Sequence, residues 1–278
     1  MQKFFKMSCA GNDYIYTFNK KLKKRQIILI SNRLSGIGSD GAVTIYKKGG
    51  NWGLKIYNAD GGRASFCGNA TMSVAKYLFD NGLVLGNYFC LHTDSGIKKV
   101  KVIGKNICKR VILQIGEPSF TVSKNQFING QCINERIRLY YDSEEVDFIA
   151  SVVWVGNLHL VVTSFKDCEK EQERIVNAVQ KSGLFPSGVN VEFITFHDGC
   201  VSAVVYERGS GRTLACGSGC SAIFAVLNKI GKCGNCLTVK FEGGTLKAFL
   251  KNGSVFISGV PRYEKINRGS VNEYKVGL

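Results

Sequence analysis

Hydrophobic positions follow two periods along the chain, and together they predict an α+β fold. Short apolar or alternating segments rich in Val, Ile, Tyr and Phe are typical of β-strands, and segments with an apolar residue every three to four positions are typical of helices. We predict helices at 25–34, 67–82, 169–180 and 216–231. We predict strands at 3–7, 14–18, 42–46 and 54–58, β-rich sequence over 88–113, and further strands at 152–155, 160–163, 191–195 and 202–206.

This order of elements occurs twice. A cysteine begins the last helix of each half, in Phe66-Cys67-Gly68-Asn69-Ala70 and in Ala215-Cys216-Gly217-Ser218-Gly219, 149 residues apart (216 − 67 = 149). Nearly the same offset relates Gly11-Asn12 to Gly156-Asn157, Gly38 to Gly188, and 93–96 to 241–244. We therefore predict a duplicated domain: residues 1–116, to which the tail 263–278 returns, and residues 117–262, with a linker at 117–145.

The chemistry available at Cys67 and Cys216 follows from their place at helix starts. A thiol there meets unpaired backbone N–H groups and the positive end of the helix dipole, and both lower its pKa toward neutrality. The N–H groups that follow form a nest suited to a carboxylate. Two acid/base groups on opposite sides of a bound molecule can invert a stereocentre. Either cysteine alone would be taken for a small buried hydrophobe; their pairing in the repeat favours a shared site between the two domains.

Composition limits the remaining classes of protein. At 278 residues and 45% hydrophobic, the chain is long enough for two domains. Residues 1–18 lack the continuous apolar core of a secretory signal, and no apolar run approaches the ~20 residues of a membrane span. Eleven cysteines without such a signal indicate reduced thiols in the cytoplasm. We rate Cys233-Gly234-Asn235-Cys236 as a structural turn, since a second pair of zinc ligands is missing.

The net charge of +16 points to a different class, because a basic surface is the footprint of nucleic-acid binding. The lysines are spread, however, and the one run, 20–25, lies where a helix should begin. No zinc-finger spacing, RNA-binding aromatic signature or basic zipper accompanies them. A nucleic-acid-binding protein therefore stays the alternative from another class, although the sequence disfavours it.

Several motifs in order along the chain resemble the diaminopimelate epimerase family. They are Gly11-Asn12-Asp13, Gly36-Ile37-Gly38-Ser39-Asp40-Gly41, Tyr57-Asn58-Ala59-Asp60-Gly61, Phe66-Cys67-Gly68-Asn69, Gly188-Val189-Asn190-Val191-Glu192-Phe193, and Glu207-Arg208-Gly209-Ser210-Gly211 with Leu214-Ala215-Cys216-Gly217-Ser218-Gly219. The resemblance implies two pseudo-symmetric domains, each with a sheet, nearly a barrel, around a central helix. It implies an amino-acid substrate and an activity that needs neither pyridoxal phosphate nor a metal. A homodimer remains possible.

The resemblance also implies roles for individual residues. Cys67 and Cys216 would be the acid/base pair, one thiolate and one thiol in each resting form, and His159 and Glu207 would tune them. The amides of Gly68, Asn69, Gly217 and Ser218 would hold the reacting carboxylate and stabilise the charge that develops on it. The substrate-binding polar residues would be Asn12, Asn58, Asn157, Asn190, Glu207 and Arg208, and Arg208 can bind a second carboxylate with two hydrogen bonds.

Departures from the family's motifs leave the substrate open. Ser8-Cys9-Ala10 replaces His-Gly-Leu, Leu158 replaces a proline, and Ala70-Thr71-Met72 replaces Gly-Ala-Arg. The segment 66–73 is instead similar to the cofactor-independent histidine racemases of the same fold. We therefore expect a racemase or epimerase of a free amino acid, with diaminopimelate and histidine nearly even as substrates. A proline racemase-like isomerase, which would share fold and thiols, is a further alternative.

Overall fold

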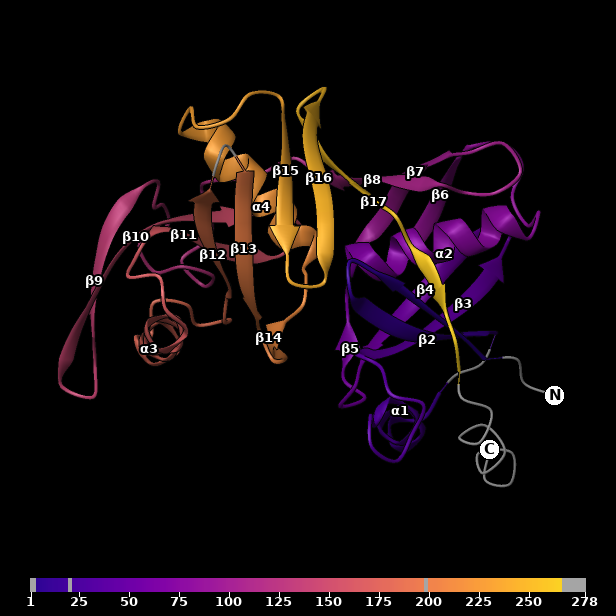
Figure 1. Ribbon diagram of the computed structural model, residues 1–278, viewed down its shortest axis with the longest axis horizontal. Helices are drawn as coiled ribbons and strands as arrows, with labels where there is room; N and C mark the ends of the chain where they lie inside the picture. Colours follow the sequence, from indigo (N-terminus) through magenta and orange to yellow (C-terminus); the bar gives the residue numbers. More distant parts are fainter. Residues whose placement is uncertain (1–3, 20–21, 198–199, 267–278) are drawn as a thin grey trace. The chain divides into compact units, whose positions relative to one another are not determined.

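The computed structural model describes residues 4–19, 22–197 and 200–266, and the chain divides into two compact units (Figure 1). Unit 1 comprises Met1–Gln114 and Ser258–Leu278, and unit 2 comprises Ile115–Ile257. The predicted domain boundaries, after residues 116 and 262, lie a few positions further along the chain. Of the predicted returning tail 263–278, residues 267–278 lie outside the described part of the chain.

Unit 1 contains one sheet whose strands follow the chain closely. Its elements are β1 (Phe5–Cys9), β2 (Asn12–Phe18), α1 (Lys24–Ser31), β3 (Gly41–Lys48), β4 (Asn51–Asn58), β5 (Arg63–Ala64), α2 (Gly68–Asp80), β6 (Tyr88–Thr93), β7 (Gly96–Ile103), β8 (Arg110–Gly116) and β18 (Arg262–Glu264). Strand β18 pairs with β1, and the order continues through β2, β3, β4, β6, β7 and β8. The pairs β2–β3 and β4–β6 are parallel, and the others are antiparallel.

Unit 2 repeats this arrangement. Its elements are β9 (Glu135–Tyr141), β10 (Glu144–Trp154), β11 (Leu158–Ser164), α3 (Glu169–Lys181), β12 (Asn190–His197), β13 (Cys200–Glu207), β14 (Gly211–Thr213), α4 (Gly217–Lys229), β15 (Cys236–Phe241), β16 (Gly244–Lys251) and β17 (Ser254–Gly259). Here β9 lies on the edge of β10, as β18 does on β1, and the parallel pairs are β11–β12 and β13–β15. The fold class is therefore α+β with two pseudo-symmetric domains, as predicted.

Even the residue-to-residue register repeats. Tyr46 lies opposite Gly53 in unit 1, and Thr195 lies opposite Ser202 in unit 2, 149 positions later in each strand. The ion pair between Arg63 and Asp94 likewise recurs as Arg212 with Glu242. Positions in the two units can therefore be compared one by one.

A helix occupies the centre of each unit (Figure 1). Every residue of α4 from Gly217 to Leu227 is buried, and so is almost every residue of α2 from Gly68 to Leu78. Strands cover such helices on all sides, so the apolar surface continues around the helix rather than along one stripe. Cys67 and Cys216 stand at the N-terminal ends of α2 and α4. Each central helix therefore places its cysteine at one end of its unit.

Some predicted elements need correction. The predicted linker 117–145 contains strand β9, and β10 begins at Glu144, eight residues before the predicted strand. Helix α1 ends at Ser31 instead of Leu34, because the Asn32 side chain accepts hydrogen bonds from the amides of Leu34 and Ser35 and turns the chain. No helix in the described part of the chain is long and apolar enough to cross a membrane.

Candidate active site

Cys67 is the N-cap residue of α2. Its extended backbone (φ −144°) sends the thiol back over the first turn, where Sγ accepts a hydrogen bond from the amide of Ala70 at 3.5 Å. The thiol also donates to Oδ1 of Asn12 at 3.4 Å, and its side chain is partly exposed. Cys67 and Asn12, which we predicted separately, are therefore in contact within unit 1.

Asn12 is held by a network of charged side chains. Its amide nitrogen donates to Asp40 at 2.6 Å, and the backbone amides of Asp13 and Asp40 each donate to the other's carboxylate at 3.0 Å. Arg33 bridges both carboxylates, and Lys6 pairs with Asp13 at 2.8 Å. The motifs that contain Asn12-Asp13 and Asp40 thus form one structure, and it fixes the amide that faces Cys67.

Three other predicted residues lie in the segments that lead into and out of Cys67. Gly68 and Asn69 form the buried first turn of α2. Asn58 ends β4, where its amide donates to the carbonyl of Gly62 at 2.8 Å and its carbonyl accepts from Gly61 at 2.9 Å. This turn leads through β5 to Cys67, so Asn58 lies at the end of the strand that delivers the cysteine loop.

Cys216 caps α4 in the same way. Its Sγ accepts from the amide of Gly219 at 3.3 Å, lies 3.3 Å from the Ser218 hydroxyl, and belongs to a residue that is 5% exposed. Its pKa is raised well above the ordinary value, first by burial and then by the carboxylates of Glu207 and Glu192. The prediction of a lowered pKa is thus wrong for Cys216, because loss of water and two nearby acids outweigh the helix terminus.

Glu207 reaches this thiol from the end of β13. Its carboxylate accepts a 2.6 Å hydrogen bond from Thr213 and interacts with the Cys216 thiol. Burial raises the pKa of Glu207, and the neighbouring Glu192 carboxylate raises it further. The predicted neighbour of the cysteine is therefore in contact with it.

His159 lies beneath the same site in a fully buried pair with Glu192. Its Nδ1 lies 2.6 Å from Glu192 Oε1, its Nε2 lies 2.8 Å from Asn157 Oδ1, and neither His159 nor Glu192 is exposed. Asn157, which we predicted as a substrate-binding residue, is thus hydrogen-bonded to His159. A Cβ added to Gly219 would lie 2.9 Å from Glu192 Oε1, so the carboxylate packs directly against the first turn of α4.

Glu192 is the functional candidate that we did not single out from the sequence. The signal was present, since it interrupts the apolar strand Val191-Glu192-Phe193-Ile194 with a charge. Lys, Glu, Arg and Asp are almost never fully buried unless paired. Its partner, His159, lies in another strand, 33 residues earlier.

Asn190 and Arg208 form a second contact in unit 2. The Asn190 side chain accepts from the Arg208 amide at 2.9 Å and donates to the carbonyl of Leu158 at 3.0 Å. The Arg208 guanidinium donates to the carbonyl of Ser187 at 2.5 Å, and the Arg208 stem covers Gly188, where an added Cβ would lie 2.6 Å from Cδ. Glycine at 188 therefore keeps room for this exposed cation.

Comparison with known proteins gives a consistent result. The sequence model of the family described as diaminopimelate epimerase matches residues 4–121 and 151–262. A diaminopimelate epimerase of Bacillus subtilis (strain 168) is 34% identical over 275 residues, covering 92% of this chain and 94% of its own length. One from Phocaeicola vulgatus is 34% identical over 272 residues, with the same two coverages.

Solved structures show the same fold at low sequence identity. A hydroxyproline epimerase from Agrobacterium vitis has a TM-score of 0.68 and 16% identity, covering 96% of this chain and 91% of its own. A predicted epimerase from Pseudomonas aeruginosa has a TM-score of 0.70 and 14% identity, covering 95% and 98%. With relatives above 30% identity over nearly the whole length, the chain belongs to the diaminopimelate epimerase family.

Proposed function

We propose that the protein epimerises diaminopimelate with Cys67 and Cys216 as its acid/base pair. The observation that carries this is that both thiols cap the central helix of their unit and accept a hydrogen bond from its third amide. The relatives named above are diaminopimelate epimerases, which supports the substrate. One cysteine removes the α-proton from one face, and the other returns a proton to the opposite face.

The surrounding groups support the charge changes in such a reaction. The amides of Gly68, Asn69, Gly217 and Ser218 would bind the α-carboxylate and stabilise the negative charge that appears on it when the proton leaves. The raised pKa of Cys216 suits the thiol that donates a proton. A cytoplasmic location is part of this proposal, because reducing compartments keep such thiols free.

Burial weakens the argument for histidine as the substrate. That argument rested on the segment 66–73, where Ala70, Thr71 and Met72 depart from the family's motif, and these three residues are 0% exposed inside unit 1. Their identities therefore affect packing around α2 more directly than contact with a substrate. Arg208 is exposed and suits the distal carboxylate of diaminopimelate, which histidine lacks.

The decisive experiment follows exchange of the α-proton in deuterated water by NMR, with diaminopimelate, L-histidine and L-proline as separate substrates. We expect exchange and epimerisation of diaminopimelate only. Cys67→Ala and Cys216→Ala should each lower epimerisation by about a thousandfold or more. Cys236→Ala, at an exposed thiol, is the matched control. Near-normal turnover of Cys216→Ala would refute the two-base proposal, whereas turnover of histidine alone would refute only the substrate.

The variant Arg208→Met tests whether Arg208 binds the distal carboxylate of the substrate. If Arg208 binds the distal carboxylate, kcat/KM for diaminopimelate should fall by about 2–4 kcal/mol in transition-state free energy, because a charged hydrogen bond is lost. Arg212→Met is the control, since that guanidinium pairs with Glu169 and Glu242 near the same loop. Equal small losses for both variants would show that Arg208 does not determine specificity.

A further inference from the structure

At one pair of equivalent positions on the two sheets, the side chains of unit 1 are much larger than those of unit 2. In unit 1 the ring of Tyr46 lies across Gly53 of the next strand, where an added Cβ would be only 2.4 Å from the ring carbon Cζ. The Lys55 ammonium lies 5.7 Å from the centre of this ring. An aromatic ring with a cation above it thus fills this position on the sheet.

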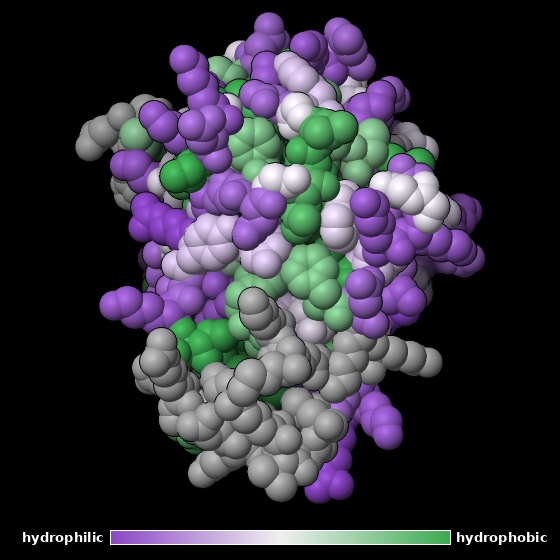
Figure 2. Space-filling view, turned by 90° about the vertical axis from the view of Figure 1, so that its right-hand side faces the viewer, coloured by the Kyte–Doolittle hydropathy of each residue, from purple (hydrophilic) through white to green (hydrophobic). Residues whose placement is uncertain are grey.

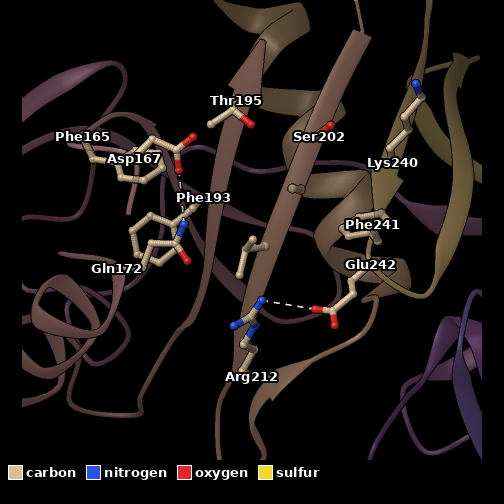
Figure 3. A pocket seen from close by; sticks show the side chains of 12 residues that line it. Phe165, Asp167, Gln172, Phe193, Thr195, Ser202, Arg212, Lys240, Phe241 and Glu242 are labelled. Atoms are coloured by element: carbon tan, nitrogen blue, oxygen red, sulfur yellow. Dashed lines mark hydrogen bonds and ion pairs between the residues drawn. The ribbon is translucent and has the colours of Figure 1, made fainter. Parts of the chain in front are cut away.

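In unit 2 the equivalent residues are too small to do so. Thr195 stands in place of Tyr46, Ser202 in place of Gly53, and Val204 in place of Lys55, by the offset of 149 residues. A hollow of about 390 Å³ opens there, which we call the β12–β13 pocket (Figure 3). Pockets that hold small ligands begin at about 300 Å³.

The pocket combines an apolar base with charged groups at its edge. Phe165 and Phe193 meet edge to face with their ring centres 5.0 Å apart, and Phe241 lines the same space (Figure 3). At the edge, Arg212 is bound to Glu242 and Gln172 donates to Asp167. Lys240 is exposed and lies beside Ser202 in the neighbouring parallel strand, so its ammonium can meet a ligand.

This pocket is separate from the cysteine site. Side chains alternate along a strand, so Phe193 and Thr195 share one face of β12 while Glu192 lies on the other. The Glu192 face packs on α4 and Cys216, whereas the Thr195 face lines the pocket. A ligand could therefore occupy the pocket without displacing a group of the candidate active site.

We propose that the β12–β13 pocket binds a small aromatic acid. The ring takes the position that Tyr46 occupies in unit 1, where it gains edge-to-face contact with phenylalanine rings. The acid group binds the Lys240 ammonium, which replaces the cation that Lys55 supplies in unit 1. The class of ligand follows from these two features together.

The probe for this proposal is 4-hydroxyphenylacetate, titrated into the ¹⁵N-labelled full chain. We expect saturable shifts of the amides of Thr195, Ser202 and Lys240. The double variant Thr195→Tyr with Ser202→Gly copies unit 1 into unit 2 and should weaken binding at least tenfold by filling the space. Thr195→Val, which keeps the volume, should bind like the wild type.

Three outcomes would overturn the proposal. Lys240→Gln changes an exposed residue and should weaken binding of 4-hydroxyphenylacetate at least threefold, while binding of 4-methylphenol stays unchanged. Unaltered binding of the acid would contradict the contact between its carboxylate and Lys240. Cyclohexylacetate has the same charge without aromaticity, and equal affinity for it would contradict ring recognition. Absence of shifts at 10 mM probe would show that the hollow is not a binding site.

Discussion

Glu192 shows how much one side chain can determine at the residue scale. It is a fully buried carboxylate that contacts the His159 ring, and a Cβ added to Gly219 would lie 2.9 Å from it. Both nitrogens of His159 are held by neighbouring side chains, Nδ1 at 2.6 Å from Glu192 and Nε2 at 2.8 Å from Asn157. We infer that Glu192 positions the His159 ring beside the first turn of α4.

The variant Glu192→Gln keeps the shape and removes the charge. We expect kcat to fall by roughly 10- to 100-fold with little change in KM, because the buried hydrogen bond between His159 and Glu192 behind the reacting thiol is weakened. The ¹⁵N signals of the His159 ring should shift, because an amide replaces the carboxylate that faces Nδ1, and the chain has only three histidines to assign. Glu242→Gln, at an exposed ion pair, is the control. Unmoved His159 signals would contradict the assignment.

At the scale of elements, the two cysteine-bearing helices are supported differently. In unit 1 the turn between β1 and β2 is fixed by Asp13, Asp40, Arg33 and Lys6. In unit 2 the equivalent strands carry the His159–Glu192 pair instead. The two units thus share the pairing of their strands, but they differ in the polar side chains that support the cysteine-bearing helix.

The variant Asp13→Asn tests how much the ion pairs of Asp13 with Arg33 and Lys6 stabilise unit 1, through the pH dependence of the unfolding free energy. Burial alone would raise the pKa of Asp13, but Arg33 and Lys6 together lower it below its ordinary value. A carboxyl with a depressed pKa stabilises the fold above its unfolded pKa of about 3.9, and this contribution disappears as pH falls through the folded pKa. We expect the variant to lose about 1–3 kcal/mol at pH 7, and the difference from wild type to shrink below pH 4.

Urea unfolding between pH 7 and pH 3 measures this difference. Asp60→Asn provides the control, since Asp60 is exposed and its carboxylate accepts a hydrogen bond from the amide of Gly62. A loss that stays constant across this pH range would contradict the ionic explanation and indicate a change in packing.

The elements that could be predicted from sequence are those with an apolar face. The Glu169 helix and the two cysteine helices agree with prediction to within a few residues, since each buries apolar side chains at helical spacing. Strand β9 has mostly exposed residues, including Arg136, Arg138 and Tyr140, so no buried face marks it in the sequence. The Glu192 pair and the β12–β13 pocket depend on which residues of different strands become neighbours, which no local pattern contains.

At the scale of the whole molecule, the charge is divided unequally. Unit 1 holds 23 Lys and Arg against 7 Asp and Glu (23 − 7 = +16), whereas unit 2 holds 14 against 14. The entire net charge therefore belongs to unit 1. Figure 2 shows one face of the molecule with hydrophilic side chains around a narrow apolar strip.

This surplus predicts weak, nonspecific attraction to polyanions. We expect a 30-nucleotide RNA to bind at low salt and to be released near 0.15 M, since counterion release makes such binding steeply salt-dependent. A filter-binding series in salt measures this, with Cys216→Ala expected to behave like the wild type. Submicromolar binding that persists at 0.15 M salt would favour the nucleic-acid-binding alternative.

Strand β18, at the edge of the unit 1 sheet, determines which fragments of the chain could fold separately. Strand β9 precedes its partner β10 in the chain, but β18, which covers β1 in the same way, comes from the far end of the sequence. A fragment ending at Gln114 would therefore leave the backbone of β1 uncovered, and such open edges promote aggregation. The two halves are related by circular permutation, so an autonomous first half would need residues 258–266 fused ahead of Phe4.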